Sequence, residues 1–108
     1  MKRIILLIII ISISVLGFAQ SKNIQNAYNS YNRQDRDGLR IKMNEAKEFI
    51  DLAYHHESTS NDPKMWNYRA KIYLEIMHNH PELDENAMFE AAEAHIRCLD
   101  KDKKGRLI

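Results

Sequence analysis

Five histidines and one cysteine are the side chains of this sequence best suited to chemistry. Four of the histidines form two close pairs, His55-His56 and His78-x-His80, and the fifth is His95. His78 and His80 precede acidic residues, and these are the ligand types of a weak divalent-metal site. Their spacing matches no helical ligand motif such as His-Glu-x-x-His. We therefore expect neither a structural metal ion nor a cofactor.

Catalysis has little support in the sequence. Cys98 falls at an apolar position of a predicted helix, where a buried and inert thiol is expected. Asp35-x-Asp37-Gly38 resembles part of a calcium loop, but alignment on Gly38 places Arg33 at the first ligand position and no Glu at the last. A turn that connects two helices is the better interpretation. We expect no catalytic residue and predict that the protein is not an enzyme.

The segment that precedes the fold has the three-part layout of a secretory signal peptide. A cationic start, Met1-Lys2-Arg3, is followed by an apolar run over Ile4 to Leu16 and by small residues before Gln20. The run is shorter than the 20 or so residues that a bilayer span needs. We predict a signal peptide over residues 1–19, cleavage near Ala19, and export to the periplasm or the extracellular space. An uncleaved anchor is the alternative, and the only membrane attachment that the sequence suggests.

Charge and cysteine content exclude two further classes of protein. The chain has 16 Lys and Arg against 15 Asp and Glu, so it lacks the basic excess of an electrostatic nucleic-acid binder. One cysteine excludes an intramolecular disulfide framework. A small exported domain of this kind must gain its stability from helix packing, from further chain or from self-association.

Helical periodicity covers residues 20–108, and we predict an all-α domain. The predicted helices span about residues 23–33, 39–56, 63–78 and 84–103. The second has an apolar stripe that starts at Leu39, and the third begins with an N-cap Asp62 and Pro63. The fourth carries apolar residues at six positions: Met88, Ala91, Ala92, Ile96, Cys98 and Leu99. We predict no strand.

Two helices share a packing pattern 45 residues apart, and each follows a helix with a related pattern. Small residues on one face allow close approach to a neighbouring helix, as in stacked helix pairs. The predicted packing positions are Ala46, Ile50, Ala53, Trp66, Ala70, Tyr73, Ala91, His95 and Cys98.

These positions resemble the tetratricopeptide repeat family over about residues 22–104. Trp66, Ala70 and Tyr73 followed by Ala91 and Cys98 give the best match. Arg69 departs from the pattern, because the family has an aliphatic residue there. The Ile-rich leader that ends in Phe-Ala-Gln and the lengthened repeats are similar to exported repeat proteins of Bacteroidota. The resemblance implies two helix-turn-helix repeats in a short right-handed α-solenoid.

The resemblance also implies a peptide-binding groove lined by the first helix of each pair. Polar residues three and four apart share one face of each of these helices. The residues predicted for the groove are Lys64, Asn67, Lys71, Lys22, Gln25 and Asn29. A solvated helix face is the alternative interpretation.

Three functions remain open from the sequence. The first is an exported scaffold or adaptor that binds an envelope protein or peptide. The second is the N-terminal piece of a longer repeat protein, because two repeats are fewer than the three that stable arrays usually need. The third is a small exported protein that binds a metal or ligand through its His-rich turn.

Overall fold

The described part of the computed structural model, residues 21–56 and 58–102, is all-helical, as predicted. It contains no strand, and its only extended pairing is an isolated bridge between Gln34 and Arg40. The predicted signal peptide, residues 1–19, lies outside this part of the chain.

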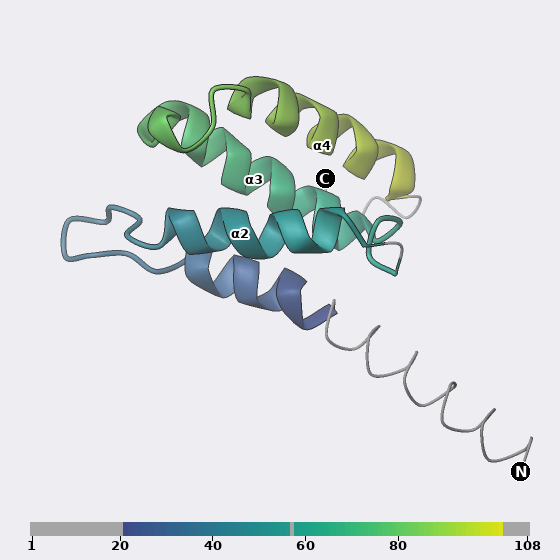
Figure 1. The fold of residues 1–108 in the computed structure, drawn as a ribbon, viewed down its shortest axis with the longest axis horizontal. Coiled ribbons are helices and arrows are strands. Elements are labelled where there is room, and N and C mark those ends of the chain that lie inside the picture. The colour runs from purple at the N-terminus through teal and green to yellow at the C-terminus, as the bar shows by residue number, and fades with distance from the viewer. Residues whose placement is uncertain (1–20, 57, 103–108) are drawn as a thin grey trace, which may run out of the picture.

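The central helix of the fold is α3, which packs against α2 on one side and α4 on the other (Figure 1). A further helix, called here the N-terminal helix, occupies residues 21–31 of the described chain and lies beside α2. The remaining elements are α2 (Met43–Tyr54), α3 (Pro63–Asn79), the 3₁₀ helix η1 (Pro81–Leu83) and α4 (Ala87–Lys101).

The start of α3 is fixed by the residues that predicted it. Asp62 Oδ1 accepts a hydrogen bond from the Lys64 amide at 2.9 Å, and Pro63 occupies the first turn. A side-chain acceptor and a proline suit a helix start because the first amides have no partner within the helix. The helix continues to Asn79, just before Pro81.

The second helix begins at Met43, so its prediction from residue 39 was wrong. Leu39 lies in the preceding loop and is 62% exposed. Asp35 Oδ1 accepts hydrogen bonds from the amides of Asp37 and Leu39 at 2.9 and 3.0 Å, and Gly38 has a φ of 80°. A short acidic side chain that satisfies nearby amides competes with helix formation, which explains the later start.

The last helix also begins later than predicted, at Ala87 rather than near residue 84. Pro81 to Leu83 form η1, and Asp84 Oδ1 then accepts a hydrogen bond from the Asn86 amide at 2.8 Å. The buried residues of α4 are all small: Ala87, Ala91, Ala94 and Cys98. Small side chains let α4 approach α3 closely. As a result, the large apolar residues predicted on this helix point elsewhere.

The core lies between α3 and its neighbours. Among the predicted packing positions, those that are buried are Ala46, Ile50, Ala53, Trp66, Tyr73, Ala91 and Cys98. Ala70 is half-buried, whereas His95 is exposed. The packing role predicted for His95 was therefore wrong, because no described element covers its side of α4.

Candidate functional site: an apolar groove between two helices

An open groove of about 500 Å³ runs between α3 and α4. We call it the α3–α4 groove. Its lining comes from both helices and consists of Asn67, Ala70, Lys71, Leu74, Met77, Met88, Ala91, Ala92 and His95. Most of this lining is apolar, and Leu74 and Met88 are 48% and 59% exposed. Large apolar side chains that stay this accessible beside a hollow are typical of binding surfaces.

Helix geometry explains why the groove exists. On α4, Ala87, Ala91, Ala94 and Cys98 follow one another at steps of four, three and four residues, which puts them on one face against α3. Met88, Ala92 and His95 lie about 100° around the helix from Ala87, Ala91 and Ala94. They form the edge of α4 that looks into the groove, and Leu74 and Met77 of α3 face them.

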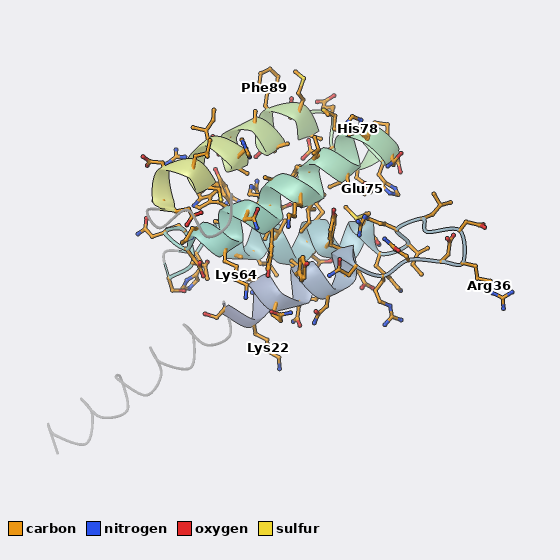
Figure 2. The ribbon with its side chains drawn as sticks, turned by 180° about the vertical axis from the view of Figure 1, so that it is seen from behind. Lys22, Arg36, Lys64, Glu75, His78 and Phe89 are labelled. Carbon is orange, nitrogen blue, oxygen red and sulfur yellow. The ribbon has the colours of Figure 1, made fainter. Side chains whose placement is uncertain are left out.

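The exposed apolar surface continues from the groove onto the outer side of α4. Phe89 is 70% exposed and Ile96 is 65% exposed, and Leu99 is half-exposed as well. Figure 2 shows Phe89 pointing away from the body of the fold. We call Met88, Phe89, Ala92, Ile96 and Leu99 the outer α4 face. Together with the groove, it makes one side of the last helix available for contact.

The polar side chains of the groove are cationic or neutral. Asn67 is half-buried, while Lys71 and His95 are exposed. The lining described contains no carboxylate. A ligand that places an acidic group near Lys71 would therefore meet a complementary charge.

The residues predicted to bind a peptide lie at separate places in the structure. Asn67 and Lys71 lie in the α3–α4 groove, next to side chains of α4 that were not predicted to take part. The Lys64 ammonium lies 5.6 Å from the Tyr68 ring centroid, outside the groove lining. Lys22, Gln25 and Asn29 are exposed on the N-terminal helix, where Gln25 donates a hydrogen bond to Asn29 at 3.0 Å. Their role in binding stays a prediction.

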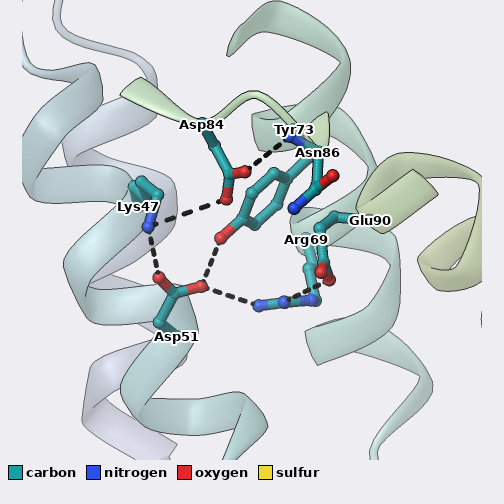
Figure 3. Close-up of polar contacts among 7 residues, drawn as sticks. All are labelled: Lys47, Asp51, Arg69, Tyr73, Asp84, Asn86 and Glu90. Carbon is teal, nitrogen blue, oxygen red and sulfur yellow. Dashed lines mark hydrogen bonds and ion pairs between the residues drawn. The ribbon is translucent and has the colours of Figure 1, made fainter. Parts of the chain in front are cut away.

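A second polar feature is an ion-pair cluster that joins three helices (Figure 3). At its centre is Arg69 of α3, which is 3% exposed. Arg69 Nη1 donates to Asp51 of α2 at 2.9 Å, and Nη2 donates to Glu90 of α4 at 2.8 Å. Its guanidinium carbon also lies 4.0 Å from the Tyr54 ring centroid. Tyr73 donates a further hydrogen bond to Asp51.

The pKa values in the cluster fit a structural role. Burial favours the neutral acid of Asp51, but hydrogen bonds from Tyr73, Lys47 and Arg69 outweigh it and lower the pKa. Burial likewise opposes the charge of Arg69, yet its bonds to Glu90 and Asp51 raise its pKa. Burial and the bond to Asp51 raise the pKa of Tyr73. Asp51, Arg69 and Tyr73 thus keep fixed protonation states near neutral pH, as groups that hold helices together should.

The sequence contained part of the signal for both features. Arg69 stood out as a departure from the repeat pattern that the chain resembles, but which carboxylates it meets depends on how three helices pack. The outer α4 face could have been found from the four small residues that share one side of α4, because the large ones must then face away. The sequence analysis did not use this argument and did not name Phe89.

The histidines do not form a metal centre in the described chain. Residues 21–56 and 58–102 contain no group of three or more His, Cys, Asp or Glu side chains placed to hold a metal ion. His78 is exposed near the end of α3 (Figure 2). His80 lies 3.9 Å from a carboxylate oxygen of Glu75 and from one of Glu82.

Burial raises the pKa of the Cys98 thiol, and the charge of Asp102 adds to the effect. Cys98 Sγ lies 3.6 Å from the carbonyl oxygen of Pro63. A thiol with a raised pKa is a weak nucleophile, which agrees with a packing position.

The described helices include none long and apolar enough to cross a membrane. Comparison of the chain with protein-family models, with curated proteins and with solved structures gave no match.

Proposed function

We propose that this protein is a helical adaptor that binds a segment of another protein through the α3–α4 groove and the outer α4 face. The observation that carries the proposal is the continuous apolar surface on one side of the last helix. Apolar residues are 47–70% exposed at Met88, Phe89, Ile96 and Leu99. Exposing this much apolar surface is unfavourable unless a partner covers it.

The fold supports a binding role for α3 and α4. The ion-pair cluster and the small-residue face of α4 hold α3 and α4 together. The groove between them is therefore formed before a partner binds. A preformed site loses less conformational entropy on binding than a site that must order itself. The resemblance to tetratricopeptide repeats, whose arrays bind protein segments, agrees with this role.

Export belongs to the same proposal. The leader over residues 1–19 is expected to direct the chain out of the cytoplasm, so the partner would be an envelope or extracellular protein. The repeat pairing and the short right-handed solenoid are likewise part of the proposal: the pairing rests on the 45-residue pattern, and the solenoid rests on the resemblance to tetratricopeptide repeats.

Site-specific photo-cross-linking in cells tests the adaptor function. A photoreactive residue in place of Ala92, inside the groove, should give a discrete cross-linked product. The same residue in place of Arg36, at the exposed loop between the N-terminal helix and α2, is the control and should give none (Figure 2).

The cross-linked protein is then purified and its binding measured directly. We expect Leu74→Glu to abolish its binding, because a charge would enter the apolar wall of the groove. Equal cross-linking from both positions, or unchanged binding by Leu74→Glu, would contradict the proposal.

A further inference from the structure

One helix pair of the described chain is already covered by a third helix, and we call this pair the filled copy of the α3–α4 groove because α2 shares the 45-residue pattern with α4. The N-terminal helix and α2 together form a surface on which α3 lies. Tyr28 of the N-terminal helix stacks on Tyr68 of α3, with ring centroids 4.2 Å apart. From α2, Asp51 is hydrogen-bonded to Arg69, and Tyr54 meets Trp66 with ring centroids 5.6 Å apart.

Residues of α2 have counterparts on α4 that lie 45 positions later in the sequence. On α2, Lys47, Asp51 and Tyr54 contact side chains of α3, and the buried residues Met43 and Ile50 lie on the same side of the helix. Their counterparts on α4 are Met88, Ala92, His95, Ile96 and Leu99. These are residues of the outer α4 face and the groove edge, and every one of them is exposed.

The difference in burial shows what is missing on α4. Met43 is 2% exposed and its counterpart Met88 is 59% exposed. Ile50 is fully buried and its counterpart His95 is exposed. In the pair formed by the N-terminal helix and α2, the 17-residue helix α3 lies on this side of α2 and contacts Asp51 and Tyr54. In the pair formed by α3 and α4, no described element covers the corresponding side of α4.

We infer that the α3–α4 groove accepts one amphipathic helix from a partner protein, seated as α3 is seated on α2. The inference rests on the proposed adaptor function and names the partner's form. A helix fits because both walls are helices and the filled copy of the same surface is occupied by one. Its apolar stripe would cover Met88, Ala92 and Ile96.

The charge of the groove lining indicates which kind of helix binds best. Where the filled copy has the apolar Ile50, the open one has His95, and Lys71 lies across the groove from α4. A carboxylate on the incoming helix would meet Lys71 and lie near His95, whereas a basic residue there would be repelled. In a symmetric dimer a second copy of this chain would bring another Lys71 to the groove, so an acidic helix is the better match.

Binding of synthetic helices tests the inference. The probe is a labelled 17-residue amphipathic peptide, the length of α3, with a Leu and Ile stripe and one central Glu. Two further peptides carry Gln or Lys in place of that Glu, and a fourth carries a central Pro. Affinities for the full chain are measured by fluorescence anisotropy, and helix formation is measured by circular dichroism.

We expect the Glu peptide to bind about fivefold more tightly than the Lys peptide, as one partly screened ion pair allows. Lys71→Glu should reverse this order. Lys64→Glu, on the same helix but outside the groove, is the matched control and should leave the order unchanged. The Pro peptide should not bind, because proline breaks the helix.

Several results would overturn the inference. One is an order of affinity that Lys71→Glu does not change, and another is equal binding of the Pro peptide, which would indicate an extended ligand. A concentration-dependent dimer in sedimentation velocity that Ile96→Glu abolishes would make a second copy the occupant. If no helical probe binds while Ala92 still cross-links a partner, the helix inference fails and the adaptor function stands.

Discussion

Arg69 is the residue whose role changes most between sequence and structure. In the sequence it departs from the repeat pattern that the chain resembles, and in the fold it ties α2 and α4 to α3. A buried guanidinium costs solvation energy, which is recovered only where carboxylates are placed to receive it. The position of Arg69 therefore specifies how the three helices meet as much as it stabilises them.

Replacing Arg69 with Met should lower the free energy of unfolding by about 2–4 kcal/mol. The change removes two charge-assisted hydrogen bonds and leaves Asp51 and Glu90 without their shared partner. Urea denaturation followed by circular dichroism measures the loss. Arg97→Met is the control, because Arg97 is exposed and only approaches the Trp66 ring, at 5.6 Å. A loss in Arg69→Met no larger than in this control would contradict the role of the cluster.

The lowered pKa of Asp51 predicts how the free energy of unfolding depends on pH. Its pKa is lower in the folded chain than its ordinary value of 3.8, so the unfolded chain binds the proton first as pH falls. The contribution of Asp51 is fully present above about pH 4 and is lost as pH falls through the folded-state pKa.

The free energy of unfolding, measured from about pH 5 to about pH 2, should thus fall more steeply in the wild type than in Asp51→Asn. Asp37→Asn, at an exposed loop carboxylate, serves as the comparison and should keep the wild-type slope. Identical slopes in all three proteins would show that Asp51 is not held in its charged form.

The sequence predicted well which segments form helices, but it placed the ends of those helices less well. The start of α3 was clear because Asp62 and Pro63 act locally, within one turn of helix. The starts of α2 and α4 were both placed early. The apolar stripe predicted for the second helix begins at Leu39, which lies in the loop that Asp35 stabilises, and the fourth helix was predicted to start soon after Pro81, where η1 and the turn at Asp84 come first. Periodicity reports which residues can be buried in a helix, and local hydrogen bonds decide where the helix begins.

The candidate site was half predictable for a related reason. Asn67 and Lys71 were found from their spacing on one helix. Their partners Met88 and Ala92 were placed on an apolar helix, but the sequence did not show that they would stay uncovered. That depends on which face of α4 packs against α3, and therefore on tertiary packing.

The outer α4 face should contribute little to the stability of the chain alone. Changing Phe89 and Ile96 to Ser should each alter the free energy of unfolding by less than about 0.5 kcal/mol, since both side chains are largely exposed. Ile72→Ala, at a fully buried position of α3, is the contrasting variant and should cost about 2–5 kcal/mol. Denaturation curves of the three variants check this. A loss of 2 kcal/mol or so at Ile96 would mean that the outer α4 face is already covered within the chain.

The two ends of the described helix array differ in the polarity of their exposed side chains. The outer side of the N-terminal helix is polar, with Lys22, Gln25 and Asn29 exposed, whereas the last helix exposes apolar residues. A head-to-tail assembly would set these unlike surfaces against each other, which is unfavourable. This asymmetry agrees with a partner that binds at the α4 end.

An NMR footprint of the central-Glu peptide on the isotopically labelled chain locates the binding site residue by residue. We expect the most perturbed amide signals to be those of Lys71, Leu74, Met88 and Ala92, and we expect Lys71→Glu to weaken the perturbation at a given peptide concentration. A footprint over Lys22, Gln25 and Lys64 in its place would move the site to the face that the sequence suggested. That result would show that this protein does not bind its partner through the groove between α3 and α4.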